Sequence, residues 1–228
     1  MISEKSRGVL SFFRKNIPGQ TIENDSVVCY NNCMTTMNDT YIFTKDQEKV
    51  YDTLKQGKNT FINGHAGTGK TFVLTKYIDE MREAGKNVVV TAPSGIAAIN
   101  IGGTTIHRAF KVPVELSKVA KQEKDIKPNK VMKSADIIVI DEISMCSFEV
   151  FRYLSVEFFK CKDFKKKQMI VIGDFFQVPP VVAKNDLRIL RNNFPNYKEG
   201  FSFETAEWDR YNFEVINLNE VVRQKDLE

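Results

Sequence analysis

The feature that most constrains this 228-residue chain is a glycine-rich loop set between an apolar run and a periodic one. The loop, GHAGTGKT from Gly64 to Thr71, fits the pattern G-x-x-x-x-G-K-[ST], whose backbone N–H groups can surround a chain of phosphates. Residues 60–62 before it are β-prone, and apolar residues after it recur at helical spacing, ending at Gly85: Phe72, Val73, Tyr77, Ile78 and Met81. A strand, a loop and a helix in this order direct a helix N-terminus at an anion.

The loop residues have separable roles in such a cradle. Glycines let the backbone approach phosphate oxygens and adopt the positive φ that tight loops need. Lys70 supplies a mobile charge for the outer phosphates, and the Thr71 hydroxyl is suited to Mg²⁺. We therefore expect nucleotide contacts from Gly64, His65, Ala66, Gly67, Thr68, Gly69, Lys70 and Thr71.

A second apolar run, residues 137–140, ends in two carboxylates, Asp141 and Glu142. This pattern predicts a central strand that delivers acids at its tip. Asp141 would hold Mg²⁺, usually through water, and Glu142 would orient and deprotonate an attacking water. A plain strand running into a helix over 148–159, capped by Ser147, is compatible with both roles.

A third run, residues 168–173, leads to Gln177 and the stiff pair Pro179-Pro180. Gln177 is neutral and long enough to hydrogen-bond a γ-phosphate or its attacking water. Phe110, Phe175 and Phe176 could in principle stack on bases, but we expect them in the core.

Near the start of the ordered chain, Thr44 and Gln47 form the pattern of a capping box before a helix that ends near Gly57. Gln47 has a second interpretation, an amide that reads the adenine edge of a nucleotide. Spacing alone leaves both open.

A further buried strand is predicted at 87–91, followed by small, hydroxyl-bearing and glycine residues up to position 110. Such a segment after a strand's carboxyl end can touch a ligand through backbone N–H and hydroxyl groups. His107 within it is either a structural histidine or a phosphate or base contact. A last strand is expected at 213–218, with Phe201, Phe203 and Trp208 packing in the core or at the domain edge.

Composition bounds the rest. An apolar content of 42% and 17 Phe are ample for a core, and a net charge of +4 says little about nucleic acid. The lysine-rich segments 111–133 and 160–167 are either solvated faces or basic flanks of a nucleic-acid path. Cys29 and Cys33 have no downstream Cys/His pair, so we expect no zinc site.

Residues 1–40 are predicted to be an arm or linker, with an amphipathic helix or weak transit-like segment over 1–15. Residues 41–228 are predicted to form one α/β domain.

No apolar run approaches transmembrane length. We therefore expect a soluble intracellular protein with no membrane partner, cytoplasmic in a bacterium or phage and nuclear or mitochondrial in a eukaryote.

Five segments of the chain together resemble the first RecA-like domain of Pif-type 5′-to-3′ DNA helicases of superfamily one. In chain order they are GHAGTGKT, TAPSGIAAINIGGTTIHRAF, VIDEISM, GDFFQVPPV and LNEVVRQ. The resemblance spans roughly residues 43–224, and GDFFQVPPV after an acid pair is its most specific part. It implies an α/β RecA-like P-loop fold with a central, mostly parallel sheet flanked by helices.

The resemblance also implies roles. Gln47 would contact adenine, Thr71 and Asp141 would hold Mg²⁺, and Glu142 would be the hydrolytic base, with ATP as cofactor. Gln177 would couple the γ-phosphate to DNA, and Arg223 would be an arginine finger. Single-stranded DNA would run over Pro93, Ser94, Gly95, Asn100, Gly102, Thr105, His107 and Arg108. Ser94 and Arg108 depart from the family's usual residues, and Arg108 leaves the local DNA contact open.

Such helicases place ATP between two RecA-like domains, and this chain ends just after Arg223. The sequence therefore predicts a monomeric partial motor that hydrolyses ATP slowly and does not unwind processively by itself. Two other functions stay open, a P-loop phosphotransferase, for which no acceptor pattern is visible, and a nucleotide-binding regulatory module without motor activity.

Overall fold

The structure is a computed structural model that describes residues 43–115, 123–182, 184–195 and 197–220. Its strands are β1 (Thr60–Gly64), β2 (Val88–Ala92), β3 (Thr104–Thr105), β4 (Ile137–Ile140), β5 (Gln168–Gly173) and β6 (Glu214–Leu218). Its α-helices are α2 (Lys45–Lys55), α3 (Lys70–Glu83), α4 (Gly95–Asn100), α5 (Ile106–Phe110), α7 (Lys130–Ser134), α8 (Phe148–Phe159), α9 (Lys184–Asn193) and α10 (Ala206–Tyr211). Short 3₁₀ turns are η1 (Glu123–Asp125), η2 (Ile143–Met145), η3 (Phe164–Lys166) and η4 (Ser202–Glu204).

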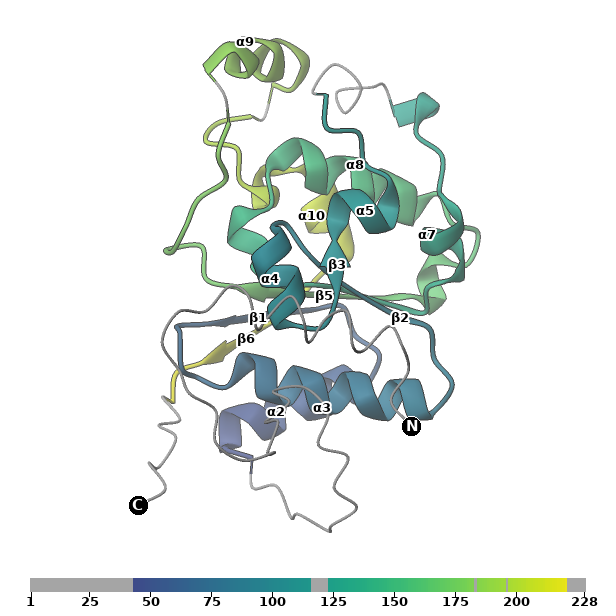
Figure 1. Cartoon of the computed structure of the whole chain (residues 1–228), viewed down its shortest axis with the longest axis vertical. Coiled ribbons are helices and arrows are strands. Elements are labelled where there is room, and N and C mark those ends of the chain that lie inside the picture. The colour runs from purple at the N-terminus through teal and green to yellow at the C-terminus, as the bar shows by residue number, and fades with distance from the viewer. Residues whose placement is uncertain (1–42, 116–122, 183, 196, 221–228) are drawn as a thin grey trace, which may run out of the picture. The chain divides into compact units, whose positions relative to one another are not determined.

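The described strands form one six-stranded sheet in the order β3-β2-β4-β5-β1-β6, and every pairing is parallel. The predicted α/β RecA-like fold is confirmed, with a sheet that is parallel throughout its described strands rather than mostly so. Helices cover both of its faces, α2 and α3 on one side and α5, α7, α8 and α10 on the other (Figure 1). Sheets buried on both sides need apolar side chains pointing in both directions, as these strands have.

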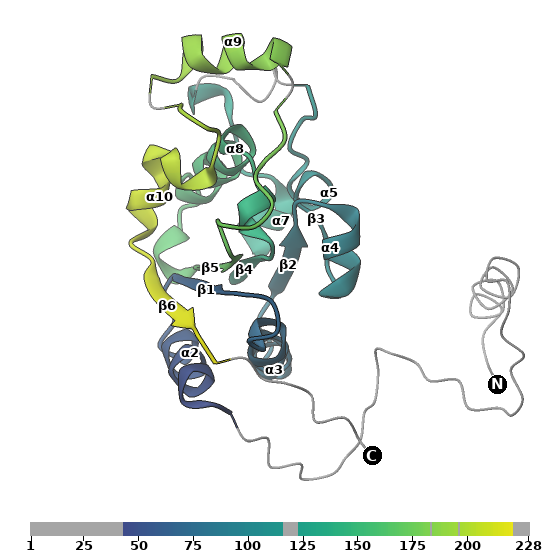
Figure 2. The same ribbon diagram turned by 90° about the vertical axis from the view of Figure 1, so that its left-hand side faces the viewer.

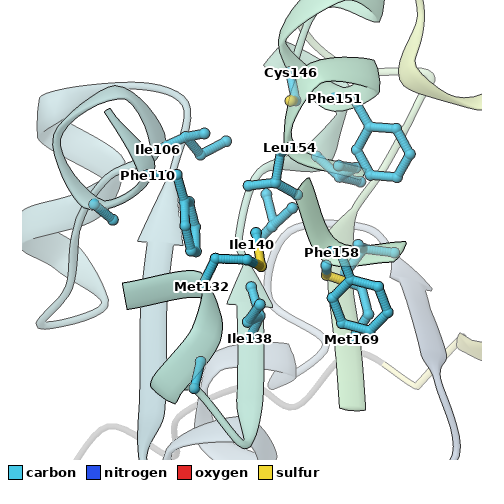
Figure 3. Packing of buried hydrophobic residues seen from close by; sticks show 14 of the residues in the cluster. Ile106, Phe110, Met132, Ile138, Ile140, Cys146, Phe151, Leu154, Phe158 and Met169 are labelled. Carbon is cyan, nitrogen blue, oxygen red and sulfur yellow. The ribbon is translucent and has the colours of Figure 1, made fainter. Parts of the chain in front are cut away.

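Strand β4 illustrates this. Ile137 and Val139 belong to the apolar cluster under α2 and α3, while Ile138 and Ile140 belong to the opposite cluster. Figure 3 shows the second cluster, in which side chains of α5, α7 and α8 meet β4 and β5. Both clusters are buried, so the strand ends are held on a rigid support.

Helix α3 confirms the predicted span and its stop at Gly85, which adopts a φ of 77° after the C-cap Ala84. Its buried face differs from the expected one. Val73, Leu74, Tyr77 and Ile78 are buried, whereas Phe72 is 39% exposed and meets the ring of Phe43 edge-on. The reason is that α3 turns Leu74 toward the sheet, which rotates Phe72 to the rim.

Helix α8 begins at Phe148 as expected and Ser147 occupies the predicted N-cap position, but its side chain does not cap the helix. The Ser147 hydroxyl donates to Glu149 Oε1 at 2.7 Å and makes no capping bond to the helix backbone. Helix α9 packs through Leu190 into a small cluster with Phe148 and with Tyr197 of the segment after the helix. This cluster lies on the side of the domain away from α2 and α3 (Figure 2).

The lysine-rich segment is partly structural. Ile126 and Met132 are buried, and α7 packs on α8. The C-terminal half of the lysine-rich segment 111–133 therefore belongs to the core. Residues 116–122 lie outside the described part, as do residues 1–42 with the predicted arm and with Cys29 and Cys33. Among the residues that the structure describes, no helix is long and apolar enough to cross a membrane.

Candidate nucleotide site and adjoining surface

The strand order brings together three segments that are far apart in the sequence. β5 lies between β4 and β1, with Asn63 of β1 level with Gly173 and Ile140 of β4 level with Val171. All three strands are parallel, so the segments after their carboxyl ends meet at one edge. These segments are the acid pair after β4, the turn after β5 and the phosphate loop after β1.

The phosphate loop has the backbone that its sequence predicts. Gly67 and Gly69 adopt φ of 82° and 77°, a region that favours glycine, and Gly69 is the N-cap of α3. A Cβ on Gly64 would lie 2.9 Å from the Leu218 carbonyl oxygen and 3.0 Å from Thr68 Oγ1. A side chain at Gly64 would therefore collide with β6 and with the loop itself. The N-terminus of the 14-residue helix α3 begins directly after the loop.

Lys70 lies within this loop. Its Nζ donates to the carbonyl oxygens of Gly64 at 2.5 Å and His65 at 2.8 Å. Burial lowers the Lys70 pKa, and the carboxylates of Glu142, Asp141 and Asp174 oppose that shift by favouring the charged ammonium. The acid pair and the turn after β5 thus share one electrostatic environment with the loop lysine.

Asp141 and Glu142 occupy the end of β4. The Asp141 N–H donates to the Thr91 carbonyl oxygen at 2.9 Å, which fixes the strand end. Burial raises the Asp141 pKa to about 6. The hydrogen bond from the Glu142 backbone opposes this rise, the Glu142 carboxylate adds to it, and Lys70 opposes it. Glu142 has a φ of 52°, a left-handed conformation that costs about 1 kcal/mol or more for a residue other than glycine. Backbone strain at such a residue is common in active sites.

The turn after β5 is organised by Asp174, which the sequence reasoning left without a role. Asp174 is 3% exposed, and its Oδ1 accepts from the Phe176 N–H at 3.0 Å. Its Oδ2 lies 2.8 Å from His65 Nδ1 and accepts from Gln177 Nε2 at 3.0 Å. Gln177 therefore sits on a carboxylate that also touches the phosphate loop. An acid just after a predicted strand was the available sequence signal, but one of its partners, His65, lies 109 residues away in the loop.

Gln47 combines two contacts. The predicted capping box is confirmed, with Gln47 Oε1 accepting from the Thr44 N–H at 3.1 Å and Thr44 Oγ1 accepting from the Gln47 N–H at 3.3 Å. The Gln47 Nε2 also donates to the Thr68 carbonyl oxygen at 3.3 Å. The residue therefore connects the start of α2 to the phosphate loop.

These residues fit a magnesium nucleotide. The loop has glycines with positive φ, and Gly64 leaves no room for a side chain. Its lysine is influenced electrostatically by three carboxylates. Thr71, on the first turn of α3, and Asp141 supply oxygen donors of the kind that Mg²⁺ prefers. Arg223, the expected arginine finger, lies outside the described residues.

The segment after β2 includes β3, and these two strands form one end of the sheet order, next to β4. Ser94 Oγ accepts from the Ala97 N–H at 3.2 Å and Thr105 Oγ1 from the Arg108 N–H at 3.3 Å, so both hydroxyls cap short helices. His107 Nδ1 donates to the Val112 carbonyl oxygen at 2.9 Å, which is the structural interpretation of this histidine. Pro93 is half-buried, and Gly95, Asn100, Gly102 and Arg108 are exposed.

Of the three aromatic residues expected in the core, Phe110 is fully buried and Phe175 packs against the core cluster. Phe176 is 93% exposed, so the expectation for it is wrong. The cause is the turn at Asp174, which directs Phe175 inward and the next residue outward.

A sequence model described as PIF1-like helicase matches residues 42–228. The chain belongs to the PIF1-like helicase family. It is 31% identical over 179 residues to the ATP-dependent DNA helicase Pif1 of Campylobacter jejuni, covering 75% of this chain and 38% of that protein. It is 34% identical over 194 residues to PIF1 of Candida albicans, covering 81% of this chain and 21% of the relative.

The fold is also similar to solved Pif1 structures. The structure of Bacteroides Pif1 bound to single-stranded DNA is 30% identical in sequence, with a TM-score of 0.63, and the match covers 82% of this chain and 44% of that chain. Bacteroides Pif1 with ADP-AlF4 is 31% identical with a TM-score of 0.62, over 81% of this chain and 44% of that one. The chain thus spans less than half the length of the relatives it matches.

Proposed function

We propose that this chain is the ATP-binding and ATP-hydrolysing motor domain of a DNA helicase, which uses Mg²⁺ and contacts single-stranded DNA. The observation that carries the proposal is the meeting of the phosphate loop, the acid pair and the Asp174–Gln177 turn at adjacent strand ends. The family relatives, named as ATP-dependent DNA helicases, support it.

In this proposal the loop amides and Lys70 bind the β- and γ-phosphates, and Thr71 and Asp141 hold Mg²⁺, which neutralises the developing charge when bound. Glu142 accepts the proton of the attacking water, and Gln177 orients that water or the γ-phosphate. Gln47, beside Thr68, would contact adenine. Arg223 would complete the transition-state charge once a nucleotide is enclosed.

The DNA path is proposed over the segment after β2. Gly95, Asn100, Gly102 and Arg108 are exposed there, and backbone and guanidinium donors suit phosphate contacts. Ser94, Thr105 and His107, whose side chains already hydrogen-bond to the backbone, would shape this path together with the half-buried Pro93. A second RecA-like domain would supply the rest of the path. A single copy as the working unit, and an intracellular location, stay predictions.

The test is steady-state ATP hydrolysis by wild type and Glu142→Gln, with and without oligo-dT. We expect oligo-dT to stimulate wild type, and Glu142→Gln to lower kcat by about 10²–10⁴-fold while retaining ATP binding, because only the proton acceptor is removed. If oligo-dT leaves hydrolysis unchanged even with a second motor domain supplied, a regulatory module that binds nucleotide without motor activity becomes the better function.

A further inference from the structure

Asp174 is buried at the end of β5, yet its carboxylate serves two segments. Part of its environment is local, because the Phe176 N–H on Oδ1 and the Gln177 N–H on the Asp174 carbonyl oxygen close the turn. The contact of Oδ2 with His65 is not local, since His65 lies in the phosphate loop after β1. Turn formation alone does not require that contact.

The chemistry of a carboxylate fixes the orientation of both partners on Oδ2. An ionised carboxylate can only accept hydrogen bonds, so the Gln177 group that faces it is the NH₂. The Gln177 carbonyl oxygen is then the part of the amide left to accept a hydrogen bond from another group. In the same way His65 presents Nδ1–H to Asp174, and its Nε2 is directed away from the carboxylate.

Three donors also keep Asp174 ionised. The Phe176 N–H, the Gln177 amide and His65 all lower the Asp174 pKa, in that order of size. The group therefore remains an acceptor across the neutral range.

We propose that Asp174 is a positioning residue that joins the phosphate loop to Gln177 through His65, so that a change in the loop reorients the Gln177 amide. Lys70 donates to the His65 carbonyl oxygen, so a nucleotide bound at Lys70 would move the His65 backbone. That movement would shift Asp174 Oδ2, the atom that both His65 and Gln177 contact. With its NH₂ anchored, Gln177 presents its carbonyl oxygen to an attacking water. This last step rests on the proposed ATPase function.

The chain offers a direct spectroscopic test, because it has only two histidines. In nucleotide-free protein labelled with ¹⁵N at histidine and glutamine, His65 and Gln177 signals are assigned by their loss in His65→Gln and Gln177→Ala. We expect an Nδ1–H tautomer at His65. We also expect His65→Ala to move the Gln177 side-chain amide signals in the wild-type background and to leave them unchanged in Asp174→Asn.

Asp174→Asn suits this test because an asparagine has one acceptor oxygen and an NH₂ group, so it cannot accept from all three donors. Asp136→Asn is the matched control, since Asp136 accepts one backbone N–H, from Asn87 at 2.8 Å, at the opposite end of the neighbouring strand. It should leave the His65 and Gln177 signals in place.

MgADP extends the test, because it lacks the γ-phosphate that Gln177 would touch directly. In wild type MgADP should shift both His65 and Gln177 signals, and in Asp174→Asn it should shift His65 alone. A Gln177 shift that persists in Asp174→Asn would overturn the proposal. Failure of wild type to bind MgADP would instead count against the nucleotide function, while the nucleotide-free comparison would still decide the role of Asp174.

Kinetics give a second readout. We expect Gln177→Ala to lower kcat about 10²-fold and Asp174→Asn about tenfold, with KM for ATP changing less than kcat in both. If Asp174 acts through Gln177, the double variant should match Gln177→Ala within about threefold rather than reach the roughly 10³-fold loss of independent effects. Additive losses would show that Asp174 does not position Gln177.

Discussion

Glu157, in the last turn of α8, is a buried carboxyl group that the proposed chemistry does not use. It is 2% exposed, and its Oε2 has no hydrogen-bond partner among the described residues. Burial raises the Glu157 pKa to about 8, and a backbone N–H of Asn129 only partly opposes this. The folded protein therefore holds this proton more tightly than the unfolded chain does, between about pH 4.5 and pH 8.

The sign of the pH dependence follows. Glu157 costs nothing below about pH 4.5, and its contribution destabilises the fold progressively as pH rises toward 8. Glu157→Gln should thus be more stable than wild type at pH 8, by on the order of 2 kcal/mol or several degrees in Tm, with the difference vanishing near pH 4.5. Thermal unfolding across this range measures it. The exposed Glu83→Gln serves as control, and a difference independent of pH would contradict the assignment.

At the scale of elements, α2 is joined to the nucleotide site by one side chain. Gln47 closes the capping box with its amide oxygen and contacts the Thr68 carbonyl with its amide nitrogen. The cap and the proposed adenine contact therefore compete for the same amide, and two substitutions separate them.

Thr44→Ala should lower stability by about 1 kcal/mol, because it removes the capping hydroxyl, and should leave ATP affinity unchanged. Gln47→Ala should lower stability similarly and also weaken ATP binding about tenfold, with little effect on GTP if the amide reads adenine. Urea unfolding and nucleotide titration measure the two effects. Equal losses for ATP and GTP would mean that Gln47 acts only by supporting Thr68.

A buried amide joins β5 to α2 and α3. Gln168 Nε2 donates to the carbonyl oxygens of Leu54 at 3.0 Å and Lys58 at 2.8 Å, and its Oε1 accepts from the Tyr77 hydroxyl at 2.6 Å. Gln168→Leu would remove three buried hydrogen bonds at once, although the Leu54 carbonyl keeps the Tyr77 hydroxyl and the Lys58 carbonyl keeps the Thr60 hydroxyl. We therefore expect a loss of about 2–4 kcal/mol in unfolding free energy, against about 1 kcal/mol for Tyr77→Phe. Urea denaturation decides it, and a loss in Gln168→Leu no larger than in Tyr77→Phe would show that water replaces the network.

At the scale of the molecule, the proposed ATP site uses one edge of the sheet. The chain spans less than half the length of its relatives. The family resemblance implies that ATP is enclosed between two RecA-like domains, and ATP bound to an isolated first domain would face solvent on one side, where charge stabilisation is weak.

We therefore expect the 228-residue chain to bind ATP and hydrolyse it slowly, and to separate no duplex DNA by itself. A fluorescent forked duplex, assayed with MgATP and the chain alone, measures strand separation. Robust unwinding by the chain alone would refute the partial-motor prediction. ATP binding with no unwinding, restored by a chain that carries both domains, is the expected result.

The sequence by itself predicted five of the six described strands, helices α2, α3 and α8, and the phosphate loop. Four apolar runs predicted β1, β2, β4 and β5, because strands buried on both faces need continuous apolar side chains. The glycine pattern at Gly64, Gly67 and Gly69 predicted the loop, because only glycine tolerates those conformations and that close packing. The roles of Glu142 and Gln177 in ATP hydrolysis came from the residue pattern and agree with the resemblance, whereas the DNA path and the coupling of Gln177 to DNA came from the resemblance. All of these roles stay predictions.

Only the tertiary structure decided which polar groups share a partner. Asp174 and His65 are 109 residues apart, and they meet because β5 and β1 are neighbours in the sheet order, which local sequence patterns do not encode. The same holds for the second contact of Gln47, which reaches Thr68 in the phosphate loop. Periodicity reports which face of an element is apolar, whereas hydrogen-bond partners depend on distances that packing alone sets.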